Sequence, residues 1–491
     1  MVSSHGDPEP PSEPSAATRA TAGPGGAPAD AVARLRDPAY IRLLVVAALL
    51  GVPVSAAAYG FLALVSYLQK ELFTHLPHGL GFTSAPAWWP LPVLLAGGVL
   101  TGLAIRYLPG GGGHSPAGGF AMHAPPAAAQ LPGLLAAALA TLAFGAVLGP
   151  EMPLIALGGG LAVLATRLAR GHTVPEQGVR VLASAGSFAA ISTLLGSPLP
   201  SAFLLMEASG LGGPMLSLAL VPGLVASGVG ALIFIGLDNL TGLGTFALAL
   251  PNLPHFSRPD VAEFGWALVI GLAAAVIGPA IHRLGLFLHG YAVKQPLLLA
   301  VLASLVVALL AIGFAEATGK AASDVLFSGQ DDLGPLVAQA GSYSAGALAL
   351  LVACKGLAYA ASLSSLRGGP IFPALFIGAA GGMALSYLPG LSLVPGVAMG
   401  MGAMTVVMLN LPLTAVLVSS LLLGSDAPAA MPPLIVAVAV AYVAAARFTP
   451  RPAASAPAAP APGTPAPPRQ ARRHLPARSP DQAGHDPGRA T

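Results

Sequence analysis

The stretch FGAVLGPEMPLIALGGG, Phe144 to Gly160, is apolar on both sides of a single carboxylate, Glu151. Reading from Glu71 onward, Glu151 is the next acidic residue in the chain. A charge inside a membrane span costs about 2.5–3.5 kcal/mol or more, so such a residue indicates function by default. The alternative is that Glu151 simply caps a helix at a water-exposed end, where a carboxylate is also favoured.

The composition around this stretch is that of a membrane protein. The 491 residues are 55% hydrophobic and only 8% charged, whereas soluble domains carry about a quarter charged residues. Several stretches approach the roughly 20 apolar residues that a span needs: Ile41–Leu68, Leu91–Ile105 with its flanks, Phe264–Ile281, Leu297–Phe314 and Ala345–Leu363. Others are shorter and broken by Gly and Pro. Broken helices persist in lipid only beside protein or a water-filled cavity, so the sequence predicts an all-α integral membrane transporter or channel.

The two ends of the chain differ from this apolar middle. Residues 1–36 are rich in Pro, Ala, Ser and Gly and lack the apolar core of a signal peptide. Residues 449–491 are rich in Pro and Ala with scattered Arg. Both tails are predicted to be disordered, which leaves residues 37–448 as the membrane domain.

Arginines beside the membrane domain predict its orientation. They lie at both ends: Arg34, Arg36, Arg42, Arg447 and Arg451. The positive-inside rule then places both termini in the cytoplasm of a multi-pass cell-membrane protein, with an even number of crossings. We interpret the net charge of +3 as this topology signal, so no nucleic-acid partner is expected. The single cysteine, Cys354, excludes an intrachain disulfide and a multi-Cys metal site.

A repeat lies in the break points. GPEMPLIALG (Gly149–Gly158) matches GPIFPALFIG (Gly369–Gly378) in its Gly-Pro start, its second Pro and its closing Gly. A second pair follows in the same order, SPLPSAFLL from Ser197 and LPLTAVLV from Leu411. Gly-Pro pairs are also common by chance in a chain with 61 Gly and 49 Pro. Two matches in order predict two repeats, about 38–238 and 260–448, with a binding site at their interface.

The prolines predict where helices start. Pro is favoured in the first helical turn, so Pro150 and Pro370 mark two helix N-termini. Each tip carries unpaired N–H groups and about half a positive charge. Two such tips facing each other would bind an anion. A third candidate is the Gly-rich segment Pro109–Gly119, where Pro116 would open another helix.

These residues together resemble the CLC family of chloride channels and chloride–proton exchangers. GGHSP (Gly112–Pro116) stands where the family has GSGIP, GPEMP (Gly149–Pro153) where it has GREGP, and GGPIFP (Gly368–Pro373) where it has GGxFxP. The segment SPLPSAFLLME resembles the family's APLAGxLFxxEE, and LPLTAV resembles its APLTGI. Lys355 matches a lysine that many members carry before the third motif. The resemblance runs from about residue 38 to residue 448.

The resemblance implies a fold, partners and site residues. It implies a homodimer with a pore in each subunit, tilted helices in two inverted repeats, no cofactor and no metal. The dimer contact would fall near Pro198–Phe234 and Met404–Leu423. Glu151 would be the gate for chloride or a similar small anion. The implied anion site is formed by Gly112, Gly113, His114, Ser115, Met152, Ile371 and Phe372.

The sequence also departs from the family pattern. Gly113 replaces the motif serine that coordinates the central anion, and the tyrosine expected after the last helix has no counterpart. We therefore expect weak central binding, and a fluoride-handling branch stays open. Arg367 either adds positive charge at a pathway mouth or is an ordinary interfacial arginine. His114 either donates to the anion or is a loop histidine packed by glycines.

Proton coupling depends on Glu207. Ungapped matching places Glu207 on the first glutamate of the family's pair and Ala208 on the second, which is the one that relays protons in exchangers. The two positions point about 100° apart on a helix. Glu207 is then a structural residue at a helix end or a displaced relay. We expect channel-like anion movement with weak or no proton coupling, and an antiporter remains the alternative.

Two other classes are disfavoured. A membrane enzyme would be expected to show a motif such as HExxH or GxSxG, or paired intramembrane carboxylates, none of which occurs. A transporter of cations or organic solutes usually adds carboxylates or aromatic walls to its broken helices. The breaks in this chain present helix N-termini, which favour anions.

Overall fold

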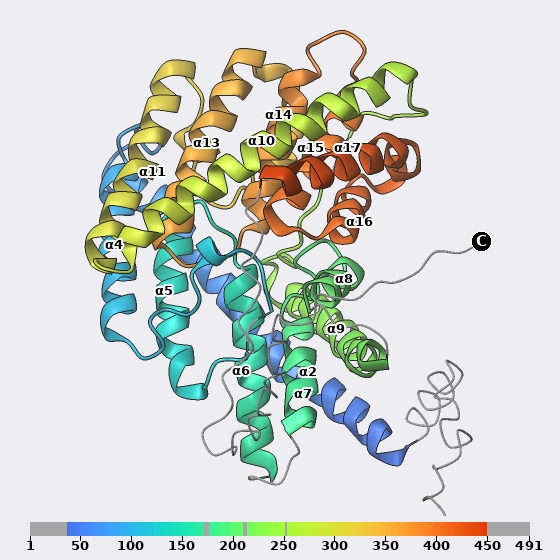
Figure 1. The fold of residues 1–491 in the computed structure, drawn as a ribbon. Coiled ribbons are helices and arrows are strands. Elements are labelled where there is room, and N and C mark those ends of the chain that lie inside the picture. The colour runs from blue at the N-terminus through green and yellow to red at the C-terminus, as the bar shows by residue number, and fades with distance from the viewer. Residues whose placement is uncertain (1–36, 123, 171–175, 210–213, 251–252, 449–491) are drawn as a thin grey trace, which may run out of the picture. The chain divides into compact units, whose positions relative to one another are not determined.

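The computed structural model describes residues 37–122, 124–170, 176–209, 214–250 and 253–448 (Figure 1). The predicted tails, residues 1–36 and 449–491, lie outside the described residues. Within the described ranges the fold is helical, with one isolated β-bridge in place of any sheet. Eight of these helices are long and apolar enough to cross a membrane. The all-α membrane fold is therefore confirmed, and each of the five predicted spans lies within one of these helices.

The helices fall into two series along the chain. The first series is α2 (Pro38–Lys70), α4 (Pro90–Tyr107), α5 (Leu131–Ala143), α6 (Glu151–Arg170), α7 (Glu176–Ala190), α8 (Pro198–Ser209) and α9 (Pro214–Thr241). The second is α10 (Val261–Ala292), α11 (Pro296–Thr318), α13 (Ala345–Ser365), α14 (Ile371–Leu385), α15 (Leu393–Leu409), α16 (Pro412–Leu422) and α17 (Ala427–Phe448). Short elements link them: η2 (Glu71–His75), α3 (Leu76–Gly79), η3 (Pro116–Gly118), η4 (Ala128–Gln130), η6 (Ala322–Asp324), α12 (Leu333–Ala338), η7 (Ala340–Ser342) and η8 (Gly424–Asp426).

The two series pack in the same order. In the first, α2 contacts α7 and α9; in the second, α10 contacts α15 and α17. Likewise α6 packs on α7 as α14 packs on α15, and α8 on α9 as α16 on α17. This correspondence is the one expected of the two inverted repeats. The helices α4 and α11 join the series by packing against each other.

Glycines that close the repeated segment explain the tightest helix pairs. A Cβ on Gly158 of α6 would overlap the carbonyl oxygen of Gly186 on α7. A Cβ on Gly378 of α14 would overlap the carbonyl oxygen of Gly400 on α15. Small residues let helix backbones approach closely in membranes. The same glycine of the sequence repeat therefore makes the same close crossing in both halves.

The helix starts differ slightly from the prediction. Helix α6 begins at Glu151 and α14 at Ile371, so Pro150 and Pro370 directly precede the first helical residue. At Pro116 the prediction of a further helix was too generous, because Pro116 opens only the three-residue 3₁₀ turn η3. The run of glycines before it, each with positive φ, folds as a loop.

Candidate functional site

The tips of α6 and α14 are joined backbone to backbone. The N–H of Gly149 donates to the carbonyl oxygen of Gly369 at 2.8 Å, and the reverse hydrogen bond is 2.6 Å long. Beside this bridge, the hydroxyl of Tyr359 on α13 donates to the carbonyl oxygen of Pro370 at 2.9 Å. The two helices therefore begin side by side, two residues after the bridge, at the interface of the repeats.

Glu151 lies between these two tips. It is the first residue of α6 and is fully buried. Its Oε1 accepts a hydrogen bond of 3.0 Å from the backbone N–H of Phe372 on α14. Its Oε2 is buried and has no hydrogen-bond partner in the described part of the chain. The carboxylate thus lies at a helix N-terminus of the other repeat, and the water-exposed capping role does not fit its burial.

Prolines limit the donors at each tip. Pro153 and Pro373 stand at the third position of α6 and α14, where a proline has no N–H. The amides without an acceptor in their own helix are then the first two of each helix, Glu151 and Met152 on α6 and Ile371 and Phe372 on α14, and that of Phe372 donates to Glu151. Three of these residues, Met152, Ile371 and Phe372, are among those that the family resemblance assigns to the anion site, and the fourth, Glu151, is the expected gate. The structure brings their helix tips together.

The Gly-rich loop is held by other partners. The hydroxyl of Ser115 lies 3.3 Å from Nδ1 of His289 on α10, and the carbonyl oxygen of Gly111 accepts from the Arg367 guanidinium at 3.3 Å. Gly112 is buried, whereas His114 is exposed. These two contacts of the loop therefore run to α10 and Arg367. They do not place Gly113, His114 or Ser115 against Glu151.

Replacing Gly113 by serine is expected to destabilise the protein. Gly113 has φ +84°, and a Cβ there would come within 2.9 Å of the Leu134 side chain. Positive φ and overpacking each disfavour a side chain, so we expect a loss of about 1–3 kcal/mol in the free energy of unfolding. Thermal unfolding of the purified Gly113→Ser variant measures this, with Gly118→Ser as a control because a Cβ there meets nothing within 4 Å. Equal melting temperatures for Gly113→Ser and the wild type would contradict it.

Glu207 lies elsewhere, at the start of α16. Its Oε1 accepts from the N–H of Leu413 at 3.0 Å, and its Oε2 accepts from the N–H and the hydroxyl of Thr414 at 2.7 and 2.6 Å. Both carboxylate oxygens therefore cap the N-terminus of α16. Glu151 and Glu207 share one pattern, because each is a first-repeat glutamate that accepts from the tip of a second-repeat helix.

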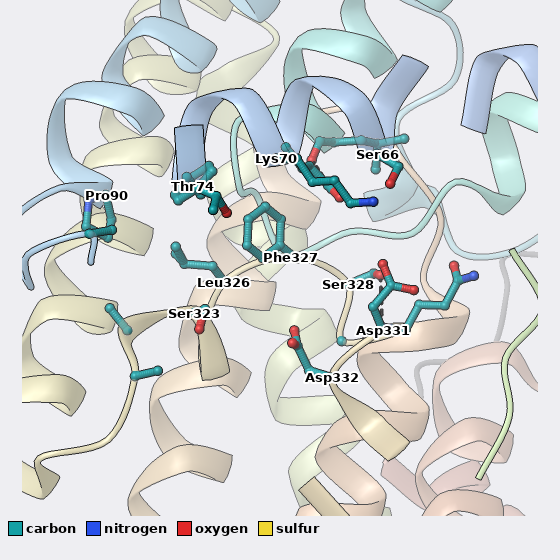
Figure 2. Close-up of a pocket in the computed structure, with 18 of the residues that line it drawn as sticks. Ser66, Lys70, Thr74, Pro90, Ser323, Leu326, Phe327, Ser328, Asp331 and Asp332 are labelled. Atoms are coloured by element: carbon teal, nitrogen blue, oxygen red, sulfur yellow. Dashed lines mark hydrogen bonds between the residues drawn. The ribbon is translucent and has the colours of Figure 1, made fainter. Parts of the chain in front are cut away.

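A cavity leads toward Glu151 from the C-terminal end of α2. This cavity, which we call the vestibule, has a volume of about 650 Å³ and reaches Leu148 and Pro150, directly before Glu151. Figure 2 shows Lys70 on one wall and Asp331 and Asp332 on the opposite wall. The vestibule therefore combines charges of both signs with an approach to the two helix tips.

Lys355 fixes the wall that carries these aspartates. It is fully buried, and its Nζ donates to the carbonyl oxygens of Asp324, Val325 and Leu326 at 2.9, 3.3 and 2.8 Å. The ammonium also lies 4.1 Å from the centroid of the Phe376 ring on α14. Lys355 thus ties the loop of the vestibule to α14, and this gives the lysine of the sequence motif a structural role.

Asp332 makes the vestibule sensitive to pH. The pKa of Asp332 is raised to about 6, chiefly by burial and also by the neighbouring carboxylates Asp331 and Asp324, against the lowering effect of Lys355. Burial also raises the pKa of Asp331, where Lys70 opposes it. As the pH falls through about 6, Asp332 takes up a proton and the vestibule loses a negative charge. The electrostatic potential in the vestibule therefore becomes more positive on the acid side.

We expect Asp332→Asn to remove the part of the pH dependence of chloride efflux that comes from the vestibule. Measured in a Glu151→Gln background, so that Glu151 does not titrate, chloride efflux from proteoliposomes should rise roughly twofold to tenfold at pH 7 because a repelling charge is gone. Its change between pH 5 and pH 7 should then flatten. The exposed Glu316→Gln serves as the control. An unchanged pH profile in Asp332→Asn would show that the vestibule charge does not govern entry.

Two features of the site were missed by the sequence analysis. Tyr359, which anchors the start of α14, lies one helical turn after Lys355 and so shares its buried face. That spacing is a usable signal. Asp331 and Asp332 come from a loop between α11 and α13, and nothing in their local sequence points toward Pro150.

Known proteins match this chain over most of its membrane domain. A sequence profile of the family described as "Voltage gated chloride channel" matches residues 120–446. YfeO of Salmonella schwarzengrund, whose name gives it a presumed role in ion transport, is 31% identical over 347 residues, which cover 69% of this chain and 79% of YfeO. YfeO of Salmonella choleraesuis is 31% identical over 350 residues, with the same coverage.

Solved structures share the fold. A slow cyanobacterial Cl⁻/H⁺ antiporter superposes with a TM-score of 0.65 at 20% identity, covering 84% of this chain and 96% of the antiporter. A CLC-type fluoride/proton antiporter superposes with a TM-score of 0.52 at 19% identity, covering 82% of this chain and 95% of that protein. These two structures show the fold, and the profile and the YfeO relatives show the family: the chain belongs to the voltage-gated chloride channel (CLC) family of membrane anion transporters.

Proposed function

We propose that this protein moves chloride or a similar small inorganic anion through a pore in each subunit, with Glu151 as the gate. The observation that carries the proposal is the position of Glu151 at the paired tips of α6 and α14. Its carboxylate is buried there and accepts a hydrogen bond from the Phe372 amide. A carboxylate in such a place competes with a free anion for the same donors. The anion enters when the carboxylate leaves.

The test is ion flux from purified protein in liposomes. Efflux of radiolabelled chloride is compared with efflux of radiolabelled sodium from the same preparation. We expect chloride efflux well above that of empty liposomes and sodium efflux equal to it. Sodium efflux matching that of chloride would reject an anion pathway.

We further propose that the transport is channel-like, with weak or no proton coupling. Both oxygens of Glu207 accept hydrogen bonds at the tip of α16, which supports a structural cap in place of a proton relay. Ala208 stands where exchangers carry the relay. The second candidate is an antiporter of chloride or fluoride and protons, favoured by the two solved structures with this fold.

We expect no uphill proton movement. Proteoliposomes carry a chloride gradient, the membrane potential is clamped with valinomycin, and external pH is recorded. Because Glu207 is engaged as a cap, chloride should move without a matched proton flux, and Glu207→Gln should leave the chloride-to-proton ratio unchanged. Proton movement at a fixed ratio to chloride would refute channel-like transport, and its loss in Glu207→Gln would identify Glu207 as a relay.

The orientation and assembly complete the proposal. With both termini in the cytoplasm of the cell membrane, the Lys70 end of α2, and with it the vestibule, faces outside. We propose a homodimer formed through α8, α9 and α16. Exposed apolar side chains on these helices support it, among them Leu199, Leu232 and Leu413.

A further inference from the structure

Arg367 lies between the Gly-rich loop and the tip of α14. Its backbone N–H donates to the hydroxyl of Thr141 on α5 at 3.1 Å. Its guanidinium donates to the carbonyl oxygens of Leu366 and Gly111 at 3.2 and 3.3 Å. Two residues later in the chain, Gly369 lies directly against the Glu151 carboxylate. Arg367 therefore belongs to the same short backbone segment as Gly369, which packs against the Glu151 carboxylate.

The guanidinium has unused donors. An arginine presents five N–H groups, and two hydrogen bonds from Arg367 go to protein carbonyls. The Nε atom is buried and has no hydrogen-bond partner in the described part of the chain. A buried donor without a partner is costly unless something else accepts from it. The guanidinium thus has N–H donors for which the described part of the chain provides no acceptor.

The positive charge also lacks a protein counter-charge. Among the described residues, the ion pairs join His75 to Glu71 and His255 to Asp426, and no carboxylate pairs with Arg367. Burying a charge is unfavourable unless it is paired. The half-buried guanidinium of Arg367 contacts the Gly-rich loop, and its charge is left to be balanced by a group from outside the protein.

The Gly-rich loop makes room for this guanidinium. Gly112 is buried, and a Cβ there would lie 3.2 Å from Arg367 Nε and 2.9 Å from the Ile105 side chain. The glycine therefore lets the loop backbone approach the guanidinium directly. Gly112 and Arg367 belong to two different repeats, so the position lies at the repeat interface, like the seat of Glu151.

We propose that Arg367 is an anion ligand of the pathway and that its free N–H groups replace the two hydroxyls that this chain lacks at Gly113 and after its last helix. The inference rests on the proposed anion transport. A guanidinium forms charge-assisted hydrogen bonds, which are stronger than those of neutral hydroxyls. A small monovalent anion thus has a second, positively charged position beside the Gly-rich loop.

The test is chloride binding to full-length protein by calorimetry, in the Glu151→Gln background so that the carboxylate does not compete. Adding Arg367→Gln should weaken chloride binding at least tenfold, because charge and donors are both lost. Arg367→Lys keeps the charge but not the fork of donors, and it should bind chloride about threefold to tenfold more weakly. The control is Arg106→Gln, the same change at an exposed arginine near Ile105, which should leave binding unchanged.

A purely structural Arg367 would give a different result. It would lower the melting temperature in chloride-free buffer and leave the dissociation constant of the folded fraction unchanged, which would overturn the inference. If Arg367→Gln does not fold, Arg367→Lys decides, and wild-type affinity in that variant overturns it. Chloride efflux by the wild-type protein separates the two claims. Wild-type efflux with unchanged binding in both variants removes only the role of Arg367, whereas absent wild-type efflux removes anion transport itself.

Discussion

Glu151→Gln will raise chloride efflux from proteoliposomes roughly tenfold or more at neutral pH and will remove the part of its pH dependence that comes from Glu151, leaving the part that comes from Asp332. The Glu151 carboxylate accepts a charge-assisted hydrogen bond from Phe372 N–H, and such bonds contribute about 1.5–3 kcal/mol. Glutamine fills the same volume without the negative charge. An anion then displaces the side chain more easily, because it no longer competes with a second negative charge for the donors.

The control for this experiment is Glu207→Gln, the matched change at the other glutamate that accepts from a helix tip. Glu207 accepts its hydrogen bonds at the tip of α16, away from the α6 and α14 tips. Its loss should therefore affect stability more than gating. Efflux and pH dependence unchanged in Glu151→Gln would remove the gating role of Glu151.

Gly369→Ala should open the pathway without touching Glu151 itself. A Cβ on Gly369 would overlap Oε2 of the Glu151 carboxylate, so an alanine there forces the carboxylate out of its seat. The backbone of Gly369 is not in the positive-φ region, and alanine is acceptable in that respect. We expect chloride efflux to rise toward that of Glu151→Gln.

A double-mutant cycle makes this prediction specific. In a Glu151→Ala background the carboxylate is absent, so adding Gly369→Ala should change efflux little. Gly381→Ala is the matched control on α14, since a Cβ there meets only Val352 at 3.9 Å. Wild-type efflux in Gly369→Ala, or equal increases in both backgrounds, would contradict a steric seat for Glu151.

The fold and the central pair of helix tips could be predicted because their signals are local. Gly-Pro breaks mark the starts of α6 and α14 directly in the sequence, and the glycines that close the repeated segment, Gly158 and Gly378, make the tight helix crossings. The pairing of the two tips followed from the repeat. The structure adds the backbone bridge and the hydrogen bond from the Phe372 amide to Glu151.

The surroundings of the site could not be predicted because they depend on contacts between distant segments. Lys355 reaches a loop about thirty residues earlier in the chain, and Glu207 reaches a helix tip 206 residues later. Arg367 contacts Gly111 and Gly112, and no local sequence pattern links these distant residues to it. A motif predicts which residue type stands at a position. Only the packed structure shows which other groups that residue contacts.

The measurement that tests the central claim most directly is the position of a bound halide. Crystals of Glu151→Gln grown in bromide would locate the ion by its anomalous scattering. The account predicts a bromide between the tips of α6 and α14, within hydrogen-bond distance of the Phe372 amide, where the carboxylate oxygen of Glu151 lies in the native protein. Glutamine remaining in that seat, with no bromide at either helix tip, would contradict it.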